Sequence, residues 1–102
     1  MLNYLKQSTY ETLKSETFPL KLDDDNSLDL VLANVYDGIP PSDKYESFKI
    51  ELQGPPDFLL RQRIYEFNHE KIGIFQLFIV PVMQNEQGFL YEAVFNVLKE
   101  DG

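Results

Sequence analysis

Alternation of apolar and polar side chains is the feature that most restricts the fold of this chain. Phe48, Ile50 and Leu52 alternate with polar residues, as in a β-strand with one face on a core and the other in water. The same period of two recurs around residues 17–22, 28–36, 65–69 and 89–97, and a further apolar run covers residues 74–83. The sequence therefore predicts six short strands.

Turn-forming residues separate these strands at short intervals. Gly54 precedes two prolines, and Gly73 and Gly88 stand just before further apolar runs. Glycine accepts the positive φ of tight hairpins, whereas parallel strands need a long crossover that usually contains a helix. The prediction is a mainly β fold, a compact six-stranded antiparallel barrel or sandwich. The sequence leaves the choice between barrel and sandwich open.

A short N-terminal helix is predicted before the first strand. Ser8 is followed three residues later by Glu11, which is the spacing of a capping box at a helix start. The pattern predicts a helix over residues 8–14, with Tyr10 and Leu13 on one apolar face. So short a helix needs support from the rest of the fold.

The length and composition fit one domain. A chain of 102 residues with 43% hydrophobic residues can build one core without a disulfide or a metal. We expect a single domain over residues 1–102, made of an N-terminal helical segment (residues 1–16) and a β-domain (residues 17–98).

Residues 74–83 depart from the alternation, because large apolar side chains occupy both faces of the predicted strand. One face carries Ile74, Phe78, Val80 and Val82, and the other carries Phe75, Leu77 and Ile79. A strand with one wet face would alternate with polar residues, so both faces are expected to be covered. The N-terminal segment is the expected cover and a second copy of the chain is the alternative. With the N-terminal segment in that place, the chain is expected to be a monomer.

The charge of the chain restricts its partners. The formal net charge is −8, and a field of that sign repels phosphates, so neither nucleic acid nor an anionic membrane is an expected partner. A basic protein is the partner that the charge favours. There is no cysteine, which excludes disulfides and thiolate metal sites. The sequence shows neither a signal peptide nor a membrane-spanning run, so a cytoplasmic location is expected.

Candidate catalytic and metal-binding residues lack the partners that such chemistry needs. His69 is the single histidine; on a strand Glu66 would point away from it, and Glu70 falls in a turn. We interpret His69 as a structural residue that closes a hairpin, and enzymatic activity has no positive support. The run Asp23-Asp24-Asp25-Asn26 lacks the alternating spacing and the distal glutamate of a calcium loop, so it is interpreted as an acidic turn. Neither a metal nor a cofactor is predicted.

Three segments of the second half resemble a known family. They read F-x-I-x-L-x-G-P at residues 48–55, H-x-x-x-G-x-F-x-L-F-x-V-P-V at residues 69–82 and Y-E-A-V-F-N at residues 91–96. With Glu16-Thr17-Phe18 near the start, the chain resembles a family of small bacterial domains of unknown function. The resemblance implies a bacterial, stand-alone domain, and it implies no activity, cofactor or catalytic residue.

Two functions remain open on these grounds. The leading hypothesis is a non-catalytic protein-interaction or accessory module, because the chain is acidic and rich in aromatic residues and has no catalytic set. The alternative is a small-ligand-binding β-barrel, with Tyr65, His69, Tyr91 and Glu92 at its mouth. Under either hypothesis these four are the candidate binding residues, and the sequence does not show whether His69 and Glu92 meet in space.

Overall fold

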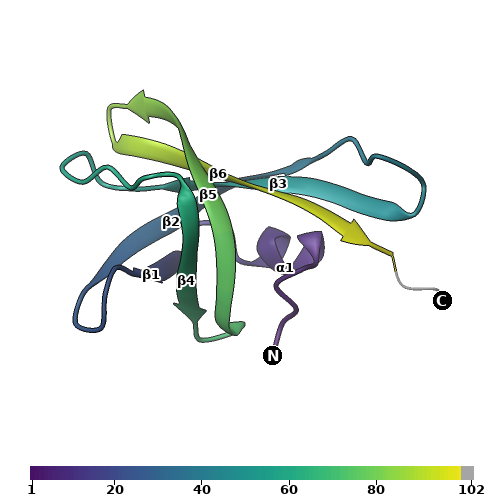
Figure 1. Ribbon diagram of the computed structural model, residues 1–102, viewed down its shortest axis with the longest axis horizontal. Helices are drawn as coiled ribbons and strands as arrows, with labels where there is room; N and C mark the ends of the chain where they lie inside the picture. The colour runs from purple at the N-terminus through teal and green to yellow at the C-terminus, as the bar shows by residue number, and fades with distance from the viewer. Residues whose placement is uncertain (100–102) are drawn as a thin grey trace.

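The computed structural model describes residues 1–99 as an antiparallel β-barrel with one short helix (Figure 1). The elements are α1 (Gln7–Thr12), β1 (Thr17–Lys21), β2 (Ser27–Asp37), β3 (Tyr45–Gln53), β4 (Arg63–His69), β5 (Gly73–Asn85) and β6 (Gly88–Leu98). The order around the barrel is β1-β2-β3-β6-β5-β4, and β4 returns to β1. The predicted six antiparallel strands are confirmed, and they form the barrel. Among residues 1–99, no helix has the length and apolarity needed to cross a membrane.

The strands turn their large apolar residues inward, as a period of two requires. The residues that follow this alternation on three strands, all buried, are Phe48, Ile50 and Leu52 on β3, Tyr65, Phe67 and His69 on β4, and Tyr91, Ala93 and Phe95 on β6. Phe48 and Phe95 stack inside the barrel with ring centroids 4.4 Å apart. The alternation predicted for these three strands is therefore confirmed.

The two long strands β5 and β6 pair only near the turn that joins them. Their register runs from Val80↔Glu92 to Asn85↔Gly88, and the remaining halves pair with β4 and β3 respectively. The helix α1 packs into the interior below β3 and β6 (Figure 1). Its Tyr10 ring lies 6.2, 6.0 and 5.4 Å, between centroids, from the rings of Phe18, Phe48 and Phe95. The helix thus completes the core where β5 and β6 separate.

The helix begins and ends slightly earlier than the sequence predicts. Its N-cap is Lys6, whose side chain makes no capping hydrogen bond. Glu11 forms an ion pair with Lys14 at 3.2 Å instead of reaching back to the helix start, so the capping-box prediction is wrong. The predicted apolar face is confirmed, because Tyr10 and Leu13 are both buried. Tertiary packing, rather than a cap, holds this short helix.

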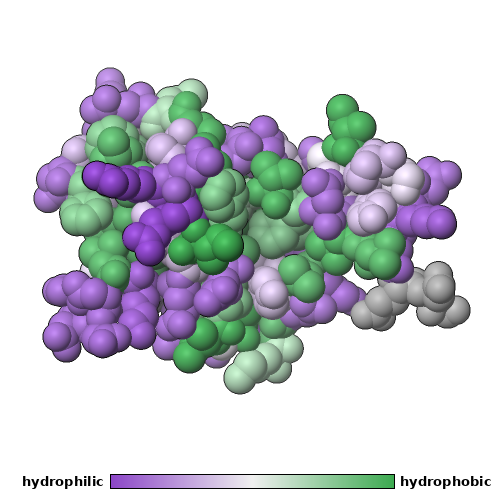
Figure 2. Space-filling view, in the orientation of Figure 1, coloured by the Kyte–Doolittle hydropathy of each residue, from purple (hydrophilic) through white to green (hydrophobic). Residues whose placement is uncertain are grey.

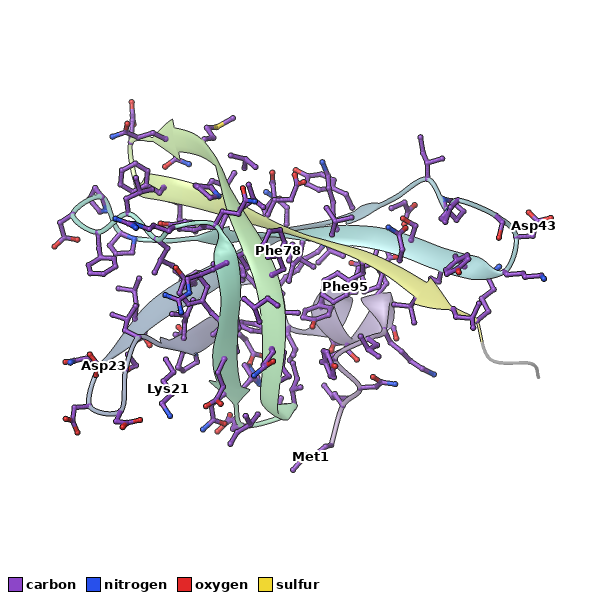
Figure 3. All side chains as sticks on the ribbon, viewed as in Figure 1. Met1, Lys21, Asp23, Asp43, Phe78 and Phe95 are labelled. Atoms are coloured by element: carbon purple, nitrogen blue, oxygen red, sulfur yellow. The ribbon has the colours of Figure 1, made fainter. Side chains whose placement is uncertain are left out.

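The prediction that the N-terminal segment covers the second face of β5 is wrong. That segment packs on the inner face, where the rings of Tyr4 and Phe75 lie 5.5 Å apart. On the outer face, Ile74 remains 69% exposed and Phe78 50% exposed. Figure 3 labels Phe78 on β5 and Phe95, a β6 residue whose ring packs on Tyr10 of α1. The interior below β3 and β6 competes successfully for the N-terminal segment, because it offers aromatic contacts on several strands at once.

The seam between β1 and β4 is the least paired junction of the barrel. β4 pairs with β5 along its whole length, but among the described residues it pairs with β1 only at Leu20↔Phe67. Pro19 stands next to that pair and has no N–H to donate to a ladder. Closure of the barrel at this seam therefore depends on side chains as well as on the backbone.

Candidate functional site

Two of the four predicted site residues, Tyr65 and Tyr91, lie together at one end of the barrel. The Tyr91 hydroxyl accepts a hydrogen bond from the Leu60 amide at 2.8 Å, and the Tyr65 hydroxyl donates one to the Arg61 carbonyl at 2.8 Å. Burial raises the pKa of Tyr91 above its ordinary value, so its hydroxyl stays protonated over the physiological range. Both tyrosines anchor the connection of residues 54–62 against the barrel.

His69 lies at the other end of β4, roughly 13 Å from Tyr65 at the rise of a strand. Its Nδ1 accepts a hydrogen bond from the Lys71 amide at 3.1 Å, so the ring hydrogen sits on Nε2 and is donated to Glu16 at 3.0 Å. The ring also packs on Phe18, with centroids 4.7 Å apart, and only 4% of the residue is exposed. Because both ring nitrogens are engaged within the fold, this histidine is not positioned as a general base.

Glu16, His69 and Lys71 form a polar cluster, which we call the Glu16 cluster. It joins β1 and β4 beyond their single backbone pair. Glu16 bonds to both partners, through Oε1 to the His69 ring and through Oε2 to the Lys71 ammonium at 3.1 Å. The hydrogen bond from Lys71 is the main reason that the pKa of Glu16 is lowered, and His69 adds to it. Sequence reasoning missed Glu16, because it lies 53 residues from His69 and only the strand order brings the two together.

The Glu16 cluster is expected to lose its stabilising effect in acid. A carboxylate whose pKa is lowered on folding stabilises the fold above its ordinary pKa of 4.5 and loses that contribution as the pH falls through the lowered value. We expect Glu16→Gln to unfold at a lower temperature than the wild type at pH 7. The difference between the two melting temperatures should shrink as the pH is lowered from 7 to below 4.5. Thermal unfolding followed by circular dichroism measures this, and a difference that does not change with pH would exclude the charge of Glu16 as its cause.

Glu92, the fourth predicted residue, lies on the outside of the sheet. It pairs with Val80 across β5 and β6, and its Oε2 lies 3.4 Å from the Lys49 ammonium. The structure therefore brings Tyr65 and Tyr91 together, places His69 at the opposite end of the barrel and leaves Glu92 on the outer surface. A role of these residues in binding stays a prediction.

The acidic segment before β2 has its own local structure. The Asp23 carboxylate accepts hydrogen bonds from the amides of Asp25 and Asn26, each at 2.9 Å. The Asn26 side chain also donates to it, and this bond is the main reason that the pKa of Asp23 is lowered. Among residues 1–99, no three His, Asp or Glu side chains are grouped as metal ligands would be. The segment is a hydrogen-bonded turn.

A group of apolar side chains remains exposed on the outside of β4, β5 and β6. We call it the outer apolar face, and it comprises Ile64, Ile74, Phe78, Val82 and Val94. In Figure 2 hydrophobic side chains gather near the middle of the molecule, where β5 crosses in front of β3 and β6 in Figure 1. Its signal in the sequence is the second apolar face of residues 74–83. An exposed group of this kind is a common mark of an interaction surface.

These features define a class of protein: a small antiparallel barrel with a packed aromatic interior, a structural histidine and an exposed apolar sheet face. The family described as Domain of unknown function (DUF6916) matches residues 5–95, and the chain belongs to this family. The resemblance to a family of small domains of unknown function, drawn from the sequence, is thereby confirmed. No curated protein matches the chain, and no solved structure matches it.

Proposed function

We propose that this protein is a non-catalytic interaction or accessory module that binds another protein in the bacterial cytoplasm. The observation that carries the proposal is the outer apolar face, where Ile64, Phe78 and Val94 are each at least half exposed. Large side chains stabilise a protein when they leave water, so their exposure is a cost that a binding partner removes. A chain without cysteine also suits a reducing compartment.

The interior of the barrel supports this proposal over a ligand-binding barrel. Tyr10, Phe18 and Phe48 fill the space enclosed by the strands, and all three are fully buried. A small ligand would have to displace such side chains, and each costs several kcal/mol to remove from a packed core. The engagement of both His69 nitrogens likewise supports a non-catalytic role.

Capture experiments with surface variants test the proposal. We expect the wild-type protein to retain a partner from a lysate of its host and Phe78→Asp to lose it, because a carboxylate in the middle of the outer apolar face cannot be desolvated cheaply. Ile39→Asp is the matched control, since Ile39 is 94% exposed but lies between β2 and β3, away from this face. Quantitative mass spectrometry of the three eluates gives the comparison.

Each result of this comparison has a defined meaning. Loss of the partner by Phe78→Asp but not by Ile39→Asp supports an interaction through the outer apolar face. Equal retention by all three proteins would show that the face is not the binding surface. Circular dichroism must show an unchanged fold, and Ile74→Asp repeats the test at a position that is 69% exposed.

A further inference from the structure

We propose that the outer apolar face binds a basic amphipathic segment of another protein, whose cationic side chains reach an acidic groove beside β4. This inference rests on the proposed function and adds the chemistry of the partner. Its two supports are an apolar strip along β5 and a row of carboxylates on the other side of β4.

The apolar strip has the dimensions of one secondary-structure element. Ile64 on β4 lies directly opposite Phe78 on β5. Ile74 is exposed towards the start of β5, and Val82 is exposed beyond Phe78, at the register shift between Pro81 and Met83. From Ile74 to Val82 the strand rises roughly 27 Å, which is the length of a helix of about 18 residues. The strip is about two strands wide, so it matches the apolar stripe of a single helix.

The acidic groove adjoins the strip through β4. It has a volume of about 330 Å³ and is lined by β1, β4 and the turn before β2. Its charged lining residues are Lys21, Asp23, Asp24, Asp25 and Glu66, and Figure 3 labels Lys21 and Asp23 at this turn. Glu66 connects the two regions, because it lines the groove and pairs with Gln76 on the strand that carries the strip. A segment lying on the strip therefore has carboxylates within reach along one side.

Charge and area both favour such a segment over a second copy of the chain. Two copies would each bring a net charge of −8 to the contact, which opposes association at low salt. The five side chains of the outer apolar face expose on the order of 500 Å² in total, whereas a stable interface between folded proteins buries about 800 Å² on each partner. A basic helix needs less apolar area, because charge attraction adds to its binding.

Designed peptides test the inference directly. Two labelled peptides of about 18 residues carry leucines at the same helical positions and either lysine or glutamate at all the others. We expect fluorescence anisotropy to show binding of the Leu/Lys peptide at least about ten times tighter than that of the Leu/Glu peptide. We also expect its affinity to fall as salt rises from about 50 to 300 mM.

Variants of the protein separate the two supports. We expect the affinity for the Leu/Lys peptide to fall about tenfold in the triple variant Asp24→Asn/Asp25→Asn/Glu66→Gln. Phe78→Asp should lower this affinity at least as much. The matched control is Asp43→Asn/Glu46→Gln/Asp57→Asn, which removes the same charge from exposed positions away from the groove. This control should keep affinity within about twofold of the wild type.

The outcomes distinguish failure of the inference from failure of the proposed function. The proposal that the partner is a basic segment would be overturned if the two triple variants lowered the affinity for the Leu/Lys peptide equally, or if the two peptides bound equally well. A capture result that depends on Phe78 would remain intact in either case. The same holds if neither peptide binds the wild type. Light scattering tests whether a second copy of the chain occupies the face instead. A dimer of the wild-type protein that Phe78→Asp dissociates would overturn the inference. If Phe78→Asp weakens neither the peptide nor the captured partner, both proposals fail.

Discussion

Replacing Tyr10 with alanine is expected to lower the free energy of unfolding by about 3 to 5 kcal/mol. Tyr10 is fully buried, and its ring meets the rings of Phe18, Phe48 and Phe95 where β5 and β6 separate. Its removal would leave a cavity bordered by three strands and would detach the side chain that anchors α1. Chemical unfolding followed by fluorescence or circular dichroism measures the loss.

Tyr10→Phe is the matched control for this experiment. It keeps the ring and removes the hydroxyl, which donates a hydrogen bond to the Tyr4 carbonyl at 2.7 Å. Loss of one such bond costs about 1 kcal/mol, so this variant should stay close to the wild type. If Tyr10→Ala and Tyr10→Phe were equally destabilised, the hydroxyl and not the aromatic packing would fix the helix in place.

Gly88→Ala is the second substitution with a large expected effect, a loss of about 3 kcal/mol or more. Gly88 has a φ of 136°, which residues with a side chain rarely adopt. A Cβ atom would also meet the Gly54 carbonyl oxygen and lie 2.6 Å from the Pro55 carbonyl carbon. These are backbone atoms, so the connection after β3 would have to move away from the turn between β5 and β6.

Gly73→Ala separates the strain of the backbone from the clash. Gly73 also has a positive φ, 96°, but the nearest atom to an added Cβ is the Met1 sulfur, at the end of a flexible side chain. Only the conformational cost remains there, about 1 to 2 kcal/mol. Urea unfolding of both variants should therefore rank Gly88→Ala as the less stable, and the reverse order would show that the connection after β3 yields easily.

Local pattern was sufficient to predict most of the barrel. The inward faces of β3, β4 and β6 follow from alternation alone, since a strand has only two faces and one of them must be dry. The positive φ of Gly73 follows in the same way from its place in a short hairpin. These predictions succeed because each depends on neighbours within a few residues.

Two predictions failed, one for a tertiary reason and one for a local reason. Residues 74–83 show two apolar faces, but the sequence does not show that the interior would take the N-terminal segment and leave Phe78 half exposed. The capping box fails locally, because Glu11 pairs with Lys14 three residues later. A capping preference of about 1 kcal/mol is small enough for other contacts to outweigh it.

The candidate site residues show the same division. His69 was interpreted as structural because neither Glu66 nor Glu70 was placed to form an acid-base pair with it. Its partner in the structure is Glu16, which lies 53 residues earlier in the chain. Tyr65 and Tyr91 come together because β4 and β6 present inward residues at the same end of the barrel. Glu92 stands between the inward residues Tyr91 and Ala93, so its outward position follows from the alternation of the strand.

The seam between β1 and β4 also bears on the order in which contacts become available during synthesis. The segment with α1, Glu16 and β1 leaves the ribosome before the other strands. Its partners Phe67, His69 and Lys71 are made about 50 residues later, and Phe95, which packs on Tyr10, comes later still. The β1–β2 hairpin can form early, but the nascent chain lacks the last aromatic contact of Tyr10 until β6 has emerged.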